Sequence, residues 1–247
     1  MTKSEEKLSF THHLAELRKR LIVCCIAIGI GFGISYYYSQ ELFTFLSRPL
    51  LDAMPQGSAF LVFTGIIEPF WTYLKIALIG GIFLASPVIF YQIWLFIAPG
   101  LYETEKKWVT PIVISATVLF IGGALFGYYV VFPVGFKYFL SFSTDALKPM
   151  LSMNEYFSFV AKFLLAFGAV FEMPILIFFL ARIGIVDAKM LSQYRKYSIL
   201  LIFIIAAILT PTPDVFSQFL MAAPMMVLYE VGVILARLFG KKREVEV

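Results

Sequence analysis

Apolar residues along this chain gather into runs of about 20, and short polar stretches separate the runs. A helix rises about 1.5 Å per residue, so a run of that length crosses the roughly 30 Å hydrocarbon core of a bilayer. The runs 78–97 and 109–132 are apolar on every face, whereas the strands of a membrane barrel alternate apolar and polar residues. The pattern therefore predicts an all-α, polytopic membrane protein.

Six transmembrane helices are expected, and no separate soluble domain lies between them, so residues 1–247 are predicted to form a single membrane domain. The fifth helix has only about 13 residues and reaches ~20 Å, so we expect the bilayer to thin there or water to enter. The predicted spans are residues 21–38, 74–97, 109–132, 158–181, 197–209 and 217–238.

Basic residues indicate the orientation of these spans. Of the 20 Lys and Arg residues, 15 lie before the first span, in the turn 99–108, in the loop 182–196 or in the C-terminal tail. Cytosolic loops near span ends carry the excess of basic residues. Both termini are therefore predicted to be cytosolic, in a multi-pass protein of the bacterial inner membrane.

Composition narrows the classes of function. The chain is 60% hydrophobic and 15% charged, which leaves too little polar surface for a water-soluble globule. The net charge of +4 comes from the basic loops, and no basic stripe with interleaved aromatic residues lies outside the spans. Nucleic acid is not expected as a partner.

The first loop contains apolar residues between 42 and 51 that share one face of a helix. They fit a short amphipathic helix that lies on the outer membrane surface or caps the bundle. An ordinary loop helix packed on its neighbours fits them equally well, and the sequence leaves both open.

Glu172 lies deep in the fourth predicted span. A carboxyl at that depth costs at least ~2.5–3.5 kcal/mol on insertion scales, so it is expected to face a protein interior or a hydrated groove. The alternative is a protonated glutamic acid that hydrogen-bonds a neighbouring helix.

Acids also precede basic residues on the predicted cytosolic face. Glu16 precedes Arg18 and Arg20, and Glu103 and Glu105 precede a pair of lysines. Acids on this face do not help to set the topology, so their presence is unexpected. Local charge pairing is one explanation, for example between Glu16 and Arg20 at i,i+4, which is worth about 0.3–0.5 kcal/mol.

Enzyme chemistry has little support in the sequence. Both histidines, His12 and His13, precede the first span, and no HExxH or GxSxG pattern occurs. No metal or cofactor is expected. A proton-coupled secondary transporter of a small solute is the alternative function, because Glu172 could relay protons, but the two halves contain no matching pair of interrupted segments.

Five segments resemble the TatC family, over about residues 10–239 and in the family's order. The resemblance implies a six-span, cup-shaped receptor subunit of the twin-arginine protein translocase. Such a subunit recognises the signal peptides of folded cargo, self-associates in a complex with TatA and TatB subunits, and depends on the proton gradient. It implies neither hydrolysis nor a cofactor. The segments are 11–21 (THHLAELRKRL), 85–94 (ASPVIFYQIW), 96–102 (FIAPGLY), 167–174 (FGAVFEMP) and 210–218 (TPTPDVFSQ).

The resemblance also assigns roles to residues. It implies that the paired arginines of the signal peptide meet Glu16 and Glu105, with Glu103 sharing or competing for the second role. Two such acids suit a site that recognises paired arginines, because the planar guanidinium of arginine keeps its charge and offers a fork of donors to a carboxylate. The other implied positions are Arg18 and Phe96 for signal-peptide binding, Pro49, Pro87 and Asp214 for loops and helix shape, Glu172 inside the cup, and Thr210 and Gln218 for contact with TatA or TatB.

Overall fold

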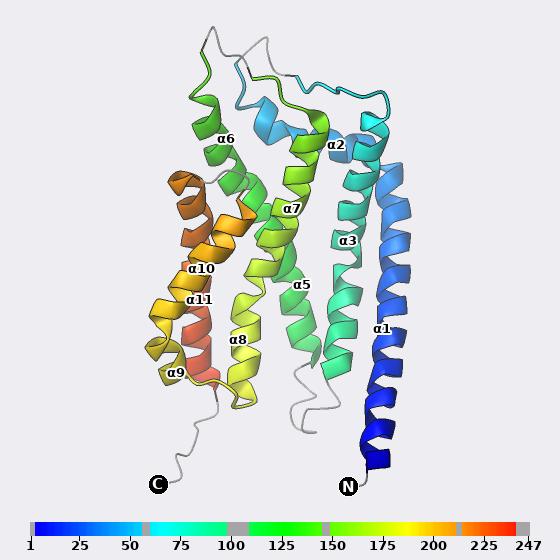
Figure 1. The fold of residues 1–247 in the computed structure, drawn as a ribbon, viewed down its shortest axis with the longest axis vertical. Helices are drawn as coiled ribbons and strands as arrows, with labels where there is room; N and C mark the ends of the chain where they lie inside the picture. Colours follow the sequence, from blue (N-terminus) through cyan, green and yellow to red (C-terminus); the bar gives the residue numbers. More distant parts are fainter. Residues whose placement is uncertain (1–2, 56–59, 98–108, 145–148, 211–213, 241–247) are drawn as a thin grey trace. The chain divides into compact units, whose positions relative to one another are not determined.

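The computed structural model describes residues 3–55, 60–97, 109–144, 149–210 and 214–240, with the side chains of the first helix described from Leu14 onward. Apart from one isolated bridge between Val62 and Ser152, the regular structure of these residues is helical, which confirms the all-α prediction (Figure 1). The elements are α1 (Lys3–Tyr37), α2 (Ser39–Leu51), α3 (Glu68–Ile97), α5 (Val109–Phe126), the π-helix η2 (Gly127–Val131), α6 (Phe132–Leu140), α7 (Met153–Phe171), α8 (Met173–Arg182), α9 (Ala188–Gln193), α10 (Arg195–Leu209) and α11 (Val215–Phe239).

Five helical stretches of the described chain are long and apolar enough to cross a membrane, so the protein is a multi-pass membrane protein. The predicted fifth span, 197–209, coincides with α10, whose 15 residues make it shorter than those five stretches. The count of six crossings therefore stays a prediction. The five stretches are Leu14–Tyr37, Glu68–Ile97, Thr110–Leu140, Met153–Arg182 and Val215–Phe239.

The chain divides into two compact units. The first unit contains residues 1–43 and 73–118, and the second contains 44–72 and 119–247. Whether they act as the single domain expected from the sequence stays a prediction.

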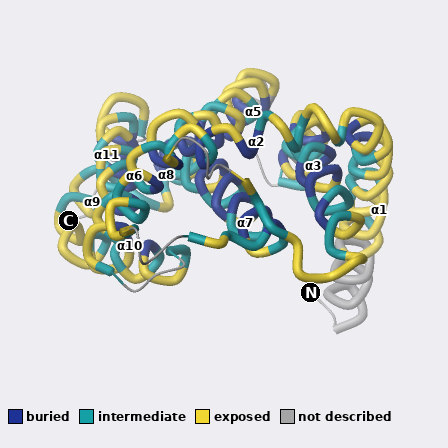
Figure 2. The backbone as a smooth tube through the Cα atoms, turned by 90° about the horizontal axis from the view of Figure 1, so that it is seen from above, coloured by how far each residue is buried: buried dark blue, intermediate teal, exposed yellow. Residues whose placement is uncertain are grey.

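Two long helices, α1 and α3, lie side by side in the first unit (Figure 1). Their backbones meet at glycines, because a Cβ atom on Gly31 would lie 2.6 Å from the carbonyl oxygen of Gly81. Small residues allow this close approach between helices in a membrane. Ile22, Ile26, Ile30 and Ile34 of α1 are exposed, and Figure 2 shows that much of the described part of α1 is exposed.

The second unit is built around α7 and α11. Gly123 of α5 sits against the backbone of α7, where an added Cβ would lie 2.6 Å from the Phe167 carbonyl oxygen. The rings of Phe163 and Phe167 pack against each other along α7 in a tilted arrangement, with centroids 4.6 Å apart and an interplanar angle of 30°. On the other side of the unit, α11 packs against α8, α9 and α10.

The loop helix α2 is packed against the protein. Leu46, Ser47, Pro49 and Leu50 are buried. Burial of this face disfavours a helix lying free on the membrane surface, and it fits both a helix that caps the bundle and an ordinary loop helix packed on its neighbours.

Candidate functional site

The first polar cluster joins α1 to α3 in the first unit. Arg20 Nη2 donates to Glu16 Oε1 at 3.0 Å, and Arg20 Nη1 donates to Gln92 Oε1 of α3 at 3.1 Å. The local pairing of Glu16 with Arg20, considered above as an alternative, is therefore formed. Because their side chains are 20% and 25% exposed, the pair lies near the surface and belongs to the class worth about 0.3–0.5 kcal/mol.

Other predicted binding residues lie around this cluster. Arg18 is exposed and lines a surface hollow on α1 with Lys19 and two apolar residues of the next turn. Phe96 is half-buried and lies one helical turn after Gln92, on the same side of α3. The structure thus groups Glu16, Arg18 and Phe96 around two helices of one unit.

The remaining acids proposed for this site, Glu103 and Glu105, lie outside the described residues. Gln92 and Arg20 were not among the candidates drawn from the sequence. An amide within the apolar run 85–97 was the available signal for Gln92. Arg20 Nε is buried and has no hydrogen-bond partner among the described residues.

Pro87 is exposed within α3. It has no N–H to donate to the carbonyl four residues earlier, so it opens one helical hydrogen bond in the half of α3 that leads to Phe96.

Glu172 separates α7 from α8 in the second unit. It ends α7 and precedes Pro174, which sits in the first turn of α8. Glu172 Oε1 is buried and has no hydrogen-bond partner within the described ranges. A buried polar atom of this kind is normally satisfied by water, a ligand or another chain, so Glu172 is a candidate contact site.

The predicted partner contact lies where α10 ends and α11 begins. Asp214 caps α11, with its Oδ1 accepting from the Ser217 amide at 2.8 Å, as is typical of an N-cap. Gln218 Nε2 donates to the Phe203 carbonyl oxygen of α10 at 3.0 Å. The Asp214 cap fixes where α11 begins, and the Gln218 bond holds the start of α11 against α10.

Thr210 and Ser217 line a small cavity in the same region, of about 30 Å³. Its other walls are apolar and come from η2, α6, α7 and α11. Ser217 Oγ is buried and makes no hydrogen bond to any described residue. Ser217 was not a candidate from the sequence, because a hydroxyl three residues after a capping Asp usually needs no function.

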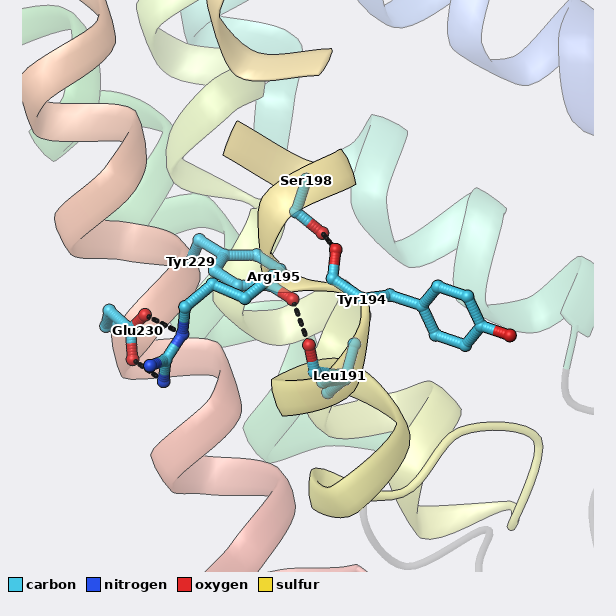
Figure 3. Close-up of polar contacts among 6 residues, drawn as sticks. All are labelled: Leu191, Tyr194, Arg195, Ser198, Tyr229 and Glu230. Atoms are coloured by element: carbon cyan, nitrogen blue, oxygen red, sulfur yellow. Dashed lines mark hydrogen bonds and ion pairs between the residues drawn. The ribbon is translucent and has the colours of Figure 1, made fainter. Parts of the chain in front are cut away.

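Another polar cluster joins the start of α10 to the middle of α11 (Figure 3). Arg195 holds Glu230 through two contacts, Nη2 to Oε2 at 2.9 Å and Nε to Oε1 at 2.8 Å. The neighbouring Tyr229 hydroxyl donates to the Leu191 carbonyl oxygen of α9 at 2.8 Å. Since α11 continues to Phe239, α10 starts about 14 Å before the end of its neighbour along the helix axis.

A further polar cluster, which was not predicted from the sequence, is centred on Glu68 at the start of α3. Glu68 Oε2 accepts from the Thr64 amide at 2.7 Å and the Gly65 amide at 3.3 Å. Glu68 Oε1 accepts from Ser152 Oγ at 2.9 Å and the Asn154 amide at 2.8 Å. One carboxylate thus joins the loop before α3 to the start of α7.

Similarity to known proteins covers nearly the whole chain. A family model described as Sec-independent protein translocase protein (TatC) matches residues 12–224. A protein of that name from Desulforapulum autotrophicum is 50% identical over 244 residues, which are 99% of this chain and 90% of the relative. Another from Koribacter versatilis is 43% identical over 237 residues, covering 95% of this chain and 87% of the relative.

Solved structures agree with the sequence relatives. A crystal structure described as the twin arginine translocase receptor TatC matches with a TM-score of 0.80 and 41% identity, covering 92% of this chain and 98% of that one. A second, described as the same receptor in DDM, has a TM-score of 0.81 and 40% identity, covering 91% and 99%. Members of this family are components of a protein translocase and are not enzymes. The alternative function, transport of a small solute, is therefore not favoured. The chain belongs to the TatC family of Sec-independent protein translocases.

Proposed function

We propose that this protein is the twin-arginine signal-peptide receptor and core subunit of a Tat translocase, which exports folded proteins across the bacterial inner membrane with TatA and TatB partners and the proton gradient. One observation carries the proposal. In this chain of the TatC family, Arg20 bonds both the Glu16 carboxylate and the Gln92 side chain, and it thereby holds the carboxylate in place.

The geometry supports a mechanism in which a signal-peptide arginine replaces Arg20 at the Glu16 carboxylate. Arg20 already forms with Glu16 the kind of contact that a signal-peptide arginine would make, so an incoming guanidinium competes for a carboxylate that is positioned for it. The exchange costs little, because a surface i,i+4 pair is worth only about 0.3–0.5 kcal/mol. Gln92 can retain Arg20 when its contact with Glu16 is lost.

The other predicted residues complete this site in the proposal. Glu105, with Glu103 beside it, supplies the second carboxylate for the arginine pair. Arg18 disfavours peptides that would place a positive charge beside it. Phe96 offers an apolar surface to the hydrophobic part of the signal peptide.

For the topology we propose six spans in a cupped bundle, with both termini in the cytosol. The 15 basic residues on one side support this orientation. The late start of α10 fits a fifth span that crosses a thinned bilayer. A reporter fused after Val247 is then cytosolic, whereas one inserted at Gln56 lies outside; a periplasmic C-terminal reporter would overturn the topology.

For the partner contact we propose that a TatA or TatB helix packs beside α10 and α11 near Thr210 and Gln218. The Ser217 hydroxyl, which makes no hydrogen bond to the residues that the structure describes, and the cavity beside it support this placement, because polar side chains from another helix can supply such a bond in a membrane. Glu172 is proposed to face a wet groove, where it meets the inserted signal peptide or a partner helix.

Peptide binding tests the proposed function. The purified full chain is expected to bind a twin-arginine signal peptide more tightly than its twin-lysine variant. Glu16→Ala should weaken binding of the arginine peptide by about 1–2 kcal/mol, or roughly five- to thirty-fold in Kd, because one charge-assisted hydrogen bond is lost. Glu155→Ala, at an exposed acid of α7, is the control and should bind as the parent does. Equal affinity for the two peptides would contradict the receptor assignment.

A further inference from the structure

Pro49 leaves one carbonyl of α2 without its helical hydrogen bond. In a regular helix the amide of residue 49 would donate to the Phe45 carbonyl oxygen, but proline has no N–H. Pro49 is itself buried, so the region offers little water to take the place of that donor. A donor from elsewhere in the protein is needed.

Tyr128 supplies that donor. Its hydroxyl donates to the Phe45 carbonyl oxygen, and the two rings stack with centroids 4.4 Å apart and an interplanar angle of 15°. Tyr128 is 5% exposed and lies in the π-helix η2, whereas the next residue, Tyr129, is 62% exposed. Short π-helical turns redirect side chains and occur frequently at functional sites.

Tyr156 of α7 makes the matching contact on the next carbonyl. Its hydroxyl donates to the Leu46 carbonyl oxygen at 2.7 Å. A carbonyl oxygen can accept a second hydrogen bond, so this contact does not require a break in α2. Two buried tyrosines from separate helices therefore bind adjacent backbone oxygens of α2, all within the second unit.

We propose that Tyr128 and Tyr156 are positioning residues that anchor α2 by its backbone, and that Pro49 serves to make the Phe45 carbonyl available to Tyr128. The anchoring keeps α2 fixed during transport and takes no part in binding the signal peptide. The link to transport rests on the proposed translocase function, whereas the anchoring itself does not.

Hydrogen exchange of the purified full chain tests the anchoring. Tyr128→Phe and Tyr156→Phe keep the rings and remove the hydroxyls, so the amides of residues 44–51 should exchange about five- to ten-fold faster, as expected for the loss of one buried hydrogen bond. Tyr129→Phe, at the exposed neighbour in η2, is the control and should leave exchange unchanged. If the amides of α2 exchanged at the same rate in Tyr128→Phe, Tyr156→Phe and Tyr129→Phe, the proposal would be overturned.

A second substitution tests the role of Pro49. Pro49→Ala restores an amide that can donate to the Phe45 carbonyl, so Tyr128→Phe should accelerate exchange less in this background than in the parent. Tyr156→Phe, which acts on the Leu46 carbonyl, should have the same effect in both backgrounds. If Tyr128→Phe gave the same acceleration with and without Pro49→Ala, the coupling between Pro49 and Tyr128 would be refuted.

Transport and peptide binding separate the anchoring from the proposed function. Tyr128→Phe should bind the twin-arginine peptide like the parent and transport cargo more slowly. Full transport by a variant whose α2 exchanges faster would overturn the positioning role. A parent protein that does not distinguish the arginine peptide from the lysine peptide would refute the receptor function, while the exchange result would still decide the anchoring.

Discussion

Adjacent glycines in α5 allow the packing between α5 and α7 to be measured by one matched pair of substitutions. A Cβ on Gly123 would meet the Phe167 carbonyl oxygen at 2.6 Å and the Phe171 side chain at 2.7 Å, whereas a Cβ on Gly122 would meet no atom within 4 Å. We therefore expect Gly123→Ala to destabilise the protein and Gly122→Ala to be tolerated.

The difference between the two variants isolates the steric cost. Both replace a mid-helix glycine, so each gains the same ~0.5–1 kcal/mol from the better helix propensity of alanine. The Phe171 ring can rotate, but the Phe167 carbonyl belongs to the α7 backbone, and the helices must separate by about 0.8 Å to bring 2.6 Å up to the 3.4 Å of an ordinary contact. Overpacking of this kind costs typically 1–3 kcal/mol.

Thermal unfolding in detergent measures this difference. For a chain of this size 1 kcal/mol corresponds to about 2–4 °C, so Gly123→Ala should melt roughly 2–12 °C below Gly122→Ala. Comparing the two variants with each other removes the unknown contribution of the detergent. Melting temperatures within about 1 °C of each other would show that α5 and α7 do not approach as closely as the structure has them.

Substitutions at three other places test the roles of Glu172, of the Arg195–Glu230 pair and of Glu68. Glu172→Gln should keep the fold and part of the transport, because the amide still forms hydrogen bonds, whereas Glu172→Leu should slow transport without weakening peptide binding; full transport by the leucine variant would remove Glu172 from the mechanism. Reversing either Arg195 or Glu230 should increase proteolysis of the 183–194 loop, and reversing both should restore the parent pattern, with a coupling of about 0.2–1 kcal/mol because both side chains are nearly half exposed. Glu68→Ala should increase cleavage in the loops before α3 and before α7 together, and a change in only one loop would show that the carboxylate does not join them.

Sequence reasoning succeeded where the determining interactions are local. The run of apolar residues placed the last span at 217–238, close to α11 at Val215–Phe239. The Glu16–Arg20 pair follows from i,i+4 spacing alone. Such features depend on residues a few positions apart, and the periodicity of the helix displays them directly.

The contacts that the sequence did not predict join residues far apart in the chain. Tyr128 binds a carbonyl 83 residues away, and Tyr156 binds one 110 residues away. Their partners are backbone atoms, which every residue possesses, so no residue type marks the acceptor. Gly122 and Gly123 are likewise equivalent in sequence, and only the packing of α5 distinguishes them. These features require the folded chain.

The Glu68 cluster has a consequence for loop length and for protein engineering. Its carboxylate accepts from two amides of the loop before α3 and from the Asn154 amide in the first turn of α7, next to the bridge between Val62 and Ser152. An insertion between 62 and 68, or between 150 and 154, would shift these amides off a carboxylate whose position is set by α3. Neither segment should therefore accept an epitope tag or a cleavage site, and relatives that change the length of one loop should carry a compensating change in the other.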